Sequence, residues 1–538
     1  MTKKVERLVP ASPKAVSAKG GGPARAEPAL SPEQRLWGDR TTKASDGFVG
    51  ARTSPVAPQT SSARQEIERA LRFRGNSLTG LSDLVLAQAT REEKVELLKA
   101  LASELRMQGK PQQDTLRTFQ RQEAVRRVLS SAPDAGAFDY LYFRMPMALR
   151  SVSGVEKLAV KHRASAKPGD WAGYEGYLEK ATGTPSAGKN QVEYLIDGAE
   201  FLPQLEKAIA ESKHSIHFWM YQWQPDEVGW DLAKKLAAKV KEGVAVRVLI
   251  DEQGTSWDDK EKVEKLLAFM RSSGIELVVN PSPLMRNHLD HRKVLIFDGK
   301  VGFTGGMNLG SSYLKDWHDD QARIEGPAVG QLQEKFVAQW EAESKKRVDR
   351  DGLFPPLKEA PNGVKTWVVN HAGKFADQNM KAAYLRAIAT AKSSIRIANA
   401  YFADKEVVKA LAAAAQRGVK VQLVLPRENH DVPILKRAAR SFYPELIAAG
   451  VEVYEYTGRM AHQKAAVIDS QWATFGSSNL DARSLAYNDE LNAVILDRRF
   501  AEDMERRLFE VDLKQSERIT QHDVTAKERL ARLMAGWL

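Results

Sequence analysis

The chain has 538 residues, of which 43% are hydrophobic and 28% charged, as in ordinary soluble globular proteins; this length exceeds one hydrophobic core, so two or three domains are expected. The formal net charge of +11 favours anionic partners, either nucleic acid or an anionic membrane surface. The absence of cysteine excludes disulfides and thiolate chemistry, and the lack of an apolar run of about 18 residues or of a secretory signal predicts a soluble or peripheral protein.

Residues 1–62 predict a disordered basic tail. They are rich in Pro, Gly, Ala and Ser and carry 10 Lys or Arg against 5 Asp or Glu, a difference of +5. Such a composition cannot bury enough apolar surface to fold alone. A solvated linker is favoured over a tether to membrane or nucleic acid.

From residue 63 to 150 the apolar spacing predicts a small helical domain. Thr90 and Glu93 match a capping box, and apolar residues then recur on one helical face. A second helix is expected over Phe119–Leu129. Residues 151–189 are rich in Lys, Gly, Ser, Pro and Ala, which predicts a connector. No chemical function is readable from this part of the chain.

From residue 190 strands and helices alternate, and the pattern occurs twice, in residues 190–350 and 351–538. In each half a helix leads into a strand, then a second helix, a strand that begins at Gly243 or Gly418, and a third strand. This alternation builds βαβ units. The predicted fold class is therefore α/β, with mixed, largely parallel sheets in two halves related by a pseudo-two-fold axis.

Each half carries the same short motif, H-x-K-x-x-x-x-D. It runs from His291 to Asp298 in the first half and from His462 to Asp469 in the second. At the same distance after each copy comes G-[GS]-x-N, which ends at Asn308 or Asn479. One copy would be a weak signal, but two copies with identical trailing elements are not a chance match.

The doubled motif is suited to a phosphodiester. One histidine can attack phosphorus while the other, protonated, donates to the leaving oxygen, and lysines and amides can hold the phosphoryl oxygens. No cluster has metal-ligand spacing, so neither a metal nor another cofactor is predicted. The catalytic candidates are His291, Lys293, Asp298, His462, Lys464 and Asp469, and the phosphate-binding candidates are Gly306, Asn308, Ser477 and Asn479.

Two acids follow the motifs at corresponding positions. Asp319 and Glu490 are the candidates that orient the histidines through their second ring nitrogen, and structural salt bridges are the alternative. Within the catalytic set, Asp298 and Asp469 fall in the turn after a buried strand. We expect these two aspartates to brace the turn more than to touch substrate.

These residues resemble the phospholipase D superfamily, which the doubled motif defines, and are most similar to bacterial cardiolipin synthases. The supporting segments are 291–299, 303–308, 317–329, 476–484 and 488–490, and the resemblance covers about residues 190–538. It implies transfer of a phosphatidyl group to phosphatidylglycerol, with release of glycerol, through a phosphohistidine. It also implies that His291 is the nucleophile and His462 the acid.

Two other activities remain open. A phospholipase D hydrolase, including a secreted one, is the first alternative, and a nuclease is less favoured. The expected partners are a phospholipid, with phosphatidylglycerol suspected, and a peripheral membrane surface, not nucleic acid. Both motifs in one chain predict an active site within a monomer. The expected location is the bacterial cytoplasmic membrane surface or the cytoplasm, with secretion not excluded.

Some residues outside the motifs have two readings. His430 and Asp431 follow a strand end, a favoured ligand position. Tryptophans near the strand ends of the first half favour core packing over a lipid-facing rim; they are Trp219, Trp223, Trp230 and Trp257. Residues 500–538 are expected to form packing helices, with Met534, Trp537 and Leu538 as membrane-contact candidates.

Overall fold

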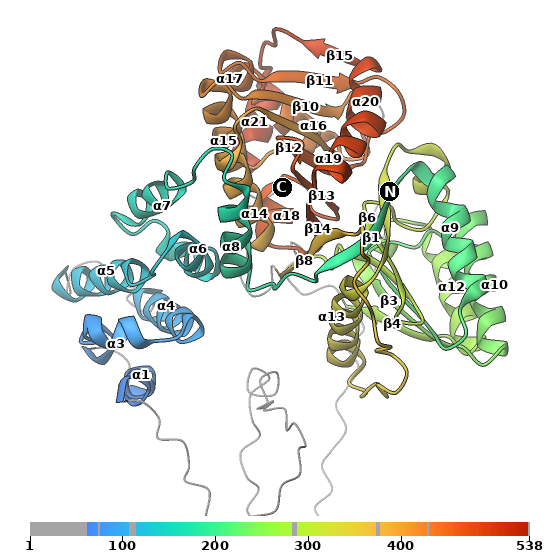
Figure 1. Ribbon diagram of the computed structural model, residues 1–538, viewed down its shortest axis with the longest axis horizontal. Helices are drawn as coiled ribbons and strands as arrows, with labels where there is room; N and C mark the ends of the chain where they lie inside the picture. Colours follow the sequence, from blue (N-terminus) through green and yellow to red (C-terminus); the bar gives the residue numbers. More distant parts are fainter. Residues whose placement is uncertain are drawn as a thin grey trace, which may run out of the picture. The chain divides into compact units, whose positions relative to one another are not determined.

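The computed structural model describes residues 62–73, 76–106, 115–281, 288–372, 377–427 and 430–535 (Figure 1). The predicted basic tail, apart from Ser62, lies outside these ranges, as do Trp537 and Leu538. Among the described helices, none combines the length and apolar content that a bilayer span requires.

The N-terminal part of the described chain is helical. The predicted capping box begins one of these helices: Thr90 N–H donates to Glu93 (2.8 Å) and Glu93 N–H donates to Thr90 Oγ1 (3.1 Å). The elements are α1 (Ser62–Phe73), α2 (Asn76–Thr79), α3 (Asp83–Gln88), α4 (Arg91–Arg106), α5 (Thr115–Ser130), α6 (Ala135–Arg144), the 3₁₀ helix η1 (Met147–Leu149), α7 (Val155–Arg163) and α8 (Trp171–Thr182).

Residues 151–189 do not form the connector that their composition predicts. They contain α7 and α8, and α8 packs against α14 (Asn379–Thr390) of the second half. Tyr174 Oη donates to Ala383 O (3.1 Å), and its ring meets Trp472 edge-on. The Gly, Pro and Lys residues that suggested a connector lie mainly in the turns at 164–170 and 183–189. The composition averaged over the whole segment did not reveal the apolar helix faces that lie between these turns.

The first half contains the elements that follow the helical part. They are β1 (Lys189–Ile196), α9 (Asp197–Glu211), β2 (Ser215–Met220), α10 (Glu227–Lys241), β3 (Ala245–Asp251), α11 (Glu252–Thr255), α12 (Lys260–Ser272), β4 (Glu276–Asn280), β5 (Lys293–Phe297), β6 (Val301–Gly305), the π-helical turn η2 (Ser312–Asp316), β7 (Asp320–Glu325) and α13 (Pro327–Ser344).

The second half repeats this order and adds a C-terminal extension. Its elements are β8 (Val364–Ala372), α14, β9 (Ser394–Asn399), α15 (Lys405–Gln416), β10 (Lys420–Pro426), α16 (Pro433–Arg440), α17 (Tyr443–Ala448), β11 (Glu452–Tyr456), β12 (Lys464–Ile468), β13 (Trp472–Gly476), α18 (Ala482–Ala486), β14 (Asp489–Leu496), α19 (Arg498–Met504), the π-helical turn η4 (Glu505–Phe509), α20 (Glu510–Lys514), β15 (Ser516–Ile519) and α21 (Ala526–Met534).

The described strands of both halves join into one continuous sheet. Its order is β15-β11-β10-β9-β12-β13-β14-β8-β1-β7-β6-β5-β2-β3-β4. From the central β1–β8 pair outwards, β1-β7-β6-β5-β2-β3-β4 in one direction matches β8-β14-β13-β12-β9-β10-β11 in the other (Figure 1). This repetition confirms the predicted α/β class and its two related halves.

The pairing is less parallel than predicted. The outer strands β2–β3–β4 and β9–β10–β11 are parallel, while the remaining described pairs are antiparallel. The prediction of a largely parallel sheet is therefore correct only for the βαβ units. The strands that carry the motifs are joined to the next strand by tight turns, which permit only antiparallel pairing.

Helices cover both faces of each half. In the first half Phe218 packs with α9, α10 and α12, while its neighbour Trp219 packs with α13 on the opposite face. In the second half Ile397 packs with α14 and α15, and Val467 packs with α19 and η4. The central strands are thus buried on both sides, and their ends are the places left for a site.

The C-terminal segment is only partly the set of packing helices that was predicted. The helices α19, α20 and α21 are present, but Ser516–Ile519 form β15, which pairs antiparallel with β11 at the sheet edge. β15 is too short for a periodic apolar pattern to reveal it, so its charged sequence did not predict a strand.

Candidate active site

The two motifs occupy equivalent positions in the sheet. In register, Lys293 at the start of β5 pairs with Met220 at the end of β2, and Lys464 at the start of β12 pairs with Asn399 at the end of β9. Both motif histidines therefore lie at the carboxyl ends of parallel strands, where α/β sheets bind ligands.

Backbone contacts join the motifs across the two halves. His291 N–H donates to Asp489 O (2.9 Å), and His462 N–H donates to His318 O (2.7 Å). Isolated bridges pair Asp290 with Asp489 and His318 with Ala461. Each motif histidine is thus held against the segment of the opposite half that carries its acid.

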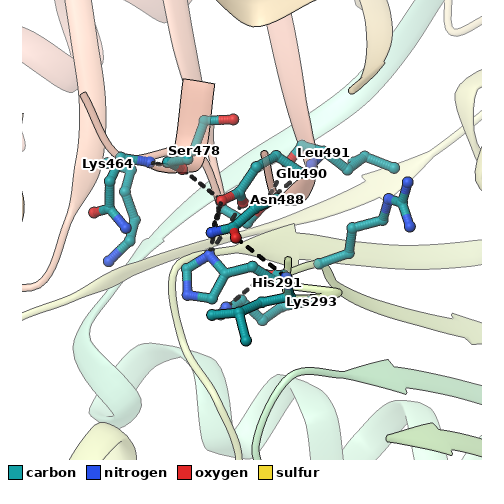
Figure 2. A network of polar contacts seen from close by, with 12 residues as sticks. His291, Lys293, Lys464, Ser478, Asn488, Glu490 and Leu491 are labelled. Atoms are coloured by element: carbon teal, nitrogen blue, oxygen red, sulfur yellow. Dashed lines mark hydrogen bonds and ion pairs between the residues drawn. The ribbon is translucent and has the colours of Figure 1, made fainter. Parts of the chain in front are cut away.

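The histidine–acid pairs are crossed between the halves. The ring of His291 faces the carboxylate of Glu490 (Figure 2), and its Nδ1 lies 3.1 Å from both carboxylate oxygens. Nδ1 of His462 lies 2.6 Å from Asp319. The sequence pointed to both acids, but their position after each motif did not reveal that each serves the histidine of the other half. The crossed pairing makes one site from two halves.

The two acids differ in their surroundings. Ser477 Oγ and Ser484 Oγ each donate to Glu490 at 2.5 Å, and Asn488 lies within 3.4 Å of it. Asp319 accepts from the Asp320 N–H at 2.8 Å. The hydroxyl donors require Glu490 to act as an acceptor, which favours its ionised form.

Gly306 and Ser477 contact the acids, which differs from the predicted phosphate contact. A Cβ at Gly306 would lie 2.2 Å from Asp319 Oδ1, so only glycine lets that carboxylate approach the backbone here. At the corresponding place in the second half, the Ser477 hydroxyl bonds Glu490. Nothing in the sequence pattern distinguishes these contacts from contacts to a phosphate.

Burial keeps both imidazoles neutral at neutral pH. It lowers the pKa of His291 to about 4 and that of His462 well below its usual value. Lys464 contributes to the lowered pKa of His291, and Lys293 and His291 contribute to that of His462, which shows that the four groups share one electrostatic environment. A neutral imidazole keeps the lone pair that a nucleophile needs.

The pKa values of the two acids move in opposite directions. Burial raises the pKa of Asp319 to about 7. Burial acts in the same sense on Glu490, but His291 and Lys293 outweigh it and lower the pKa of Glu490. Glu490 therefore stays charged beside His291, while burial makes Asp319 the weaker acid of the two.

The motif lysines are buried and fold back on their own histidines. Lys293 Nζ donates to His291 O (2.6 Å), and Lys464 Nζ donates to His462 O. Burial lowers the pKa of Lys293 to about 7 and also lowers that of Lys464. An anionic ligand between them would restore their full charge.

The two motif asparagines lie in the same region. Asn308 Oδ1 accepts from the Gln222 N–H (3.2 Å), and the Asn479 N–H donates to Ser484 Oγ (2.9 Å). Oδ1 of Asn479 is buried and has no hydrogen-bond partner within the described chain. A buried polar atom of this kind needs a partner, and a bound ligand is one way to supply it.

Asp298 and Asp469 do not join the catalytic groups. They follow β5 and β12, roughly 16 Å along the strand from the motif lysines at about 3.3 Å per residue. Asp298 accepts from the N–H groups of residues 213–215, and Asp469 accepts from those of residues 392–394. Both have left-handed backbones, with φ of 52° and 54°. They brace the strand-to-strand turns, so their place in the catalytic set is corrected.

Aromatic rings surround the histidines and were not predicted. The ring of Tyr221 lies 4.8 Å from His291, and His462 is enclosed by Trp317 at 5.0 Å, Tyr313 at 5.5 Å and Tyr401 at 6.1 Å. These rings come from separate segments. Only the fold brings them together, and they provide the apolar burial that lowers the histidine pKa values.

A further buried histidine supports the site from behind. His318 lies between two acids, with Nδ1 2.8 Å from Asp197 and Nε2 2.9 Å from Asp512. Burial alone would lower the pKa of His318, but the two carboxylates raise it to about 9, so it is charged at neutral pH. It links α9, the loop before His462 and α20.

The structure locates the residues for which the sequence allowed two interpretations. Tyr401 Oη donates to Asp431 (2.5 Å), and the ring of His430 lies 5.4 Å from Tyr401, at the edge of the site. Trp257 is 69% exposed and donates to Tyr221 Oη (3.1 Å). The other tryptophans pack in the interior, with Trp219 and Trp223 fully buried and Trp230 partly buried. Among the described residues, no group of three or more His, Asp or Glu could hold a metal ion.

Comparison with known proteins gives consistent matches. The family model described as "Cardiolipin synthase, PLD-like domain" matches residues 205–340 and 384–511. A probable cardiolipin synthase of Bacillus subtilis (strain 168) is 32% identical over 372 residues, which cover 65% of this chain and 73% of the relative. Cardiolipin synthase 1 of Staphylococcus aureus (strain MRSA252) is 31% identical over 369 residues, with coverage of 64% and 73%.

The fold also matches a solved structure. The crystal structure of phosphatidylserine synthase from Haemophilus influenzae Rd KW20 has a TM-score of 0.55 at 15% identity, and the match covers 68% of this chain and 100% of that one. At this identity the likeness shows a shared fold. The family model and the curated relatives show that the chain belongs to the cardiolipin synthase family of the phospholipase D superfamily and is an enzyme of the phosphatidyltransferase class.

Proposed function

We propose that this enzyme transfers a phosphatidyl group from one phosphatidylglycerol to the hydroxyl of a second, which forms cardiolipin and releases glycerol. The supporting observation is the pair of neutral, buried histidines, each bound through Nδ1 to an acid of the opposite half. The choice of phosphatidylglycerol draws on the names of the relatives, which are cardiolipin synthases.

In the first step Nε2 of His291 bonds to phosphorus and the bond from phosphorus to the glycerol oxygen breaks. Glu490 holds the proton on Nδ1, which leaves Nε2 free to attack. A phosphodiester anion raises the pKa of His462 on binding, because an opposite charge nearby favours the imidazolium. His462 then gives its Nε2 proton to the departing glycerol oxygen.

In the second step the flow of protons reverses. His462 takes the proton of the acceptor hydroxyl, whose oxygen bonds to phosphorus as the bond to His291 breaks. The motif lysines and asparagines donate to the non-bridging oxygens in both steps. They are Lys293, Lys464, Asn308 and Asn479. Water in the acceptor's place would yield phosphatidic acid.

Product analysis tests the reaction. Purified enzyme is incubated in mixed micelles with phosphatidylglycerol, and separately with phosphatidylcholine and with a plasmid. Cardiolipin and glycerol in equal amounts are expected from the first mixture. Phosphatidic acid without cardiolipin would identify a hydrolase, and nicked plasmid would identify a nuclease. His291→Ala and His462→Ala should each reduce turnover by roughly 10³-fold or more.

The roles of the two histidines are separable with an activated substrate. The p-nitrophenyl ester of phosphatidic acid has a leaving group that needs no proton. His462→Ala should therefore release one nitrophenolate per enzyme and stop with the phosphatidyl group on His291, as detected by mass spectrometry. His291→Ala should show no burst. An adduct on His462 instead would reverse the two roles.

A further inference from the structure

Helix α21 turns Ala531 and two charged side chains, Glu528 and Arg532, toward the protein. Glu528 is buried and receives a hydrogen bond from the Thr525 N–H (2.8 Å). Arg532 donates to Ser441 O (3.0 Å) and to Glu445 (2.7 Å). A surface helix of a globular protein ordinarily turns its large apolar side chains inward, whereas the apolar side chains that α21 buries on that side are alanines.

The outward face of α21 is apolar. Leu530, Leu533 and Met534 are 61%, 76% and 42% exposed. Their spacing of three and four residues places them in one row along the helix, which we call the α21 stripe. A row of large apolar side chains in water is unfavourable unless something covers it.

Cations border the α21 stripe. Lys527 and Arg529 on α21 and Arg437 on the neighbouring α16 are exposed. None of these three side chains pairs with a carboxylate in the part of the chain that the structure describes. An apolar row bordered by unpaired cations is the chemical pattern of a helix that lies on an anionic lipid surface.

A basic cavity lies beside the contact between α16 and α21. It has a volume of about 330 Å³, and Lys436, Arg437, Arg440 and Lys527 line it together with one acid, Glu528. Glu455 pairs with Arg440, and Thr525 and His522 bond Glu528. Arg437 and Lys527 therefore give the lining its excess of positive charge. The cavity is suited to the phosphate of a lipid headgroup at the base of the α21 stripe.

The cavity reaches the edge of the active site. His430 lines it, and the ring of His430 lies 5.4 Å from Tyr401, whose ring lies 6.1 Å from His462. A lipid headgroup held in this cavity is therefore two side chains away from a catalytic histidine. This proximity connects the surface to the chemistry.

We propose that the α21 stripe and its bordering cations dock the enzyme on an anionic phospholipid bilayer. The apolar row lies among the acyl chains, and Lys527, Arg529 and Arg437 lie at the headgroup phosphates. This inference rests on the proposed function in one respect, namely that the substrate is a membrane phospholipid. A second copy of the chain fits less well, because a symmetric contact would bring the same cations together.

Vesicle co-sedimentation of the full chain tests the docking. The protein is mixed with vesicles of phosphatidylcholine alone or with one third phosphatidylglycerol, and the bound fraction is measured. Leu530→Ser/Leu533→Ser should weaken binding to the anionic vesicles by roughly tenfold or more, because two side chains no longer enter the bilayer. Leu84→Ser on α3, which is 70% exposed, is the matched control and should bind as the wild type does.

A second double variant tests how much the cations contribute to binding. Lys527→Glu/Arg529→Glu should abolish the preference for anionic vesicles, and raising the salt concentration should have the same effect on the wild type. Equal binding by the wild type and both double variants would overturn the proposal. So would a wild-type dimer in sedimentation velocity without lipid that Leu530→Ser/Leu533→Ser converts to a monomer.

Binding and turnover are read separately. If the wild type makes no cardiolipin in mixed micelles, the proposed function fails, whatever the vesicles show. If it makes cardiolipin in micelles but does not bind anionic vesicles, only the docking proposal fails. Both readouts are positive when both inferences hold.

Discussion

At the scale of single residues, the second layer around the histidines sets their chemistry. Glu490 is a buried carboxylate with two serine hydroxyls aimed at it and His291 on its other side. Its charge holds the proton of His291 on Nδ1 and leaves Nε2 as the attacking nitrogen. Asp319 has no comparable hydroxyl donors among the described residues, so the two acids are not interchangeable.

Glu490→Gln should reduce kcat by roughly 10²–10⁴-fold, because the amide no longer fixes the imidazole tautomer or stabilises the cationic intermediate. Steady-state cardiolipin formation measures the change, and KM should change little. Ser484→Ala, which removes one donor to the same carboxylate, should produce a smaller loss. Wild-type kcat in Glu490→Gln would refute the orienting role.

For Asp298 we expect the opposite result, a loss of stability without a loss of kcat. Burial favours its neutral form, but the three backbone N–H donors prevail and lower its pKa, so the charged form stabilises the fold. Asp298→Asn should cost about 1–3 kcal/mol of stability and keep its kcat per folded molecule. Thermal unfolding and specific activity measured on the same sample check both parts. A large loss of kcat with unchanged melting would return Asp298 to the catalytic set.

At the scale of elements, the contact between α8 and α14 ties the helical part to the second half. Besides Tyr174, Tyr177 Oη of α8 donates to Ala382 O (3.4 Å), and Arg144 of α6 donates to Asn379 (2.7 Å). These contacts are buried and polar groups in them are paired. Residues 151–189 therefore contribute to the stability of the second half, whereas a connector would not.

Tyr174→Ala should destabilise the protein by about 3–5 kcal/mol, because it leaves a cavity between α8 and α14. Tyr174→Phe removes only the hydroxyl bonded to Ala383 and should cost about 1 kcal/mol. Chemical unfolding of the full chain compares the two variants. If neither variant lowers the free energy of unfolding, α8 does not support the second half.

At the scale of the whole molecule, buried histidines limit the pH range of stability from both sides. Burial lowers the pKa of His371 to about 4, below its unfolded value near 6.5, so the unfolded chain binds the proton more readily and stability falls as pH drops from about 6.5 to 4. His318 behaves oppositely. Burial opposes its charge, but Asp197 and Asp512 raise its pKa to about 9, and its contribution is complete below pH 6.5 and is lost as pH rises through 9.

The melting temperature should therefore be highest near pH 6.5 and fall on both the acid and the alkaline side. Each histidine contributes about 3 kcal/mol across its window. Calorimetry from pH 4.5 to 10 gives the profile. His318→Gln should reduce the fall on the alkaline side alone, and His371→Leu should reduce the fall on the acid side alone, where His217 and His291 also contribute. A wild-type melting temperature that is constant from pH 7 to 9.5 would contradict the charged state of His318.

The catalytic residues and the fold class could both be predicted from local patterns in the sequence. The spacing of His291 and Lys293, repeated in His462 and Lys464, is local, and so is the alternation of strands and helices. Both can be recognised in the sequence because they depend on local periods of two and 3.6 residues. The two related halves and the orienting acids were predictable for the same reason.

Only the tertiary structure decided how those parts combine. Glu490 serves His291 and Asp319 serves His462 because β1 and β8 pair at the centre of the sheet and turn the halves toward each other. No local pattern encodes contacts between positions that are 199 and 143 residues apart. Three other features depend in the same way on contacts between distant segments. They are the aromatic rings around His462, the position of His318 between two carboxylates, and the packing of α8 on α14.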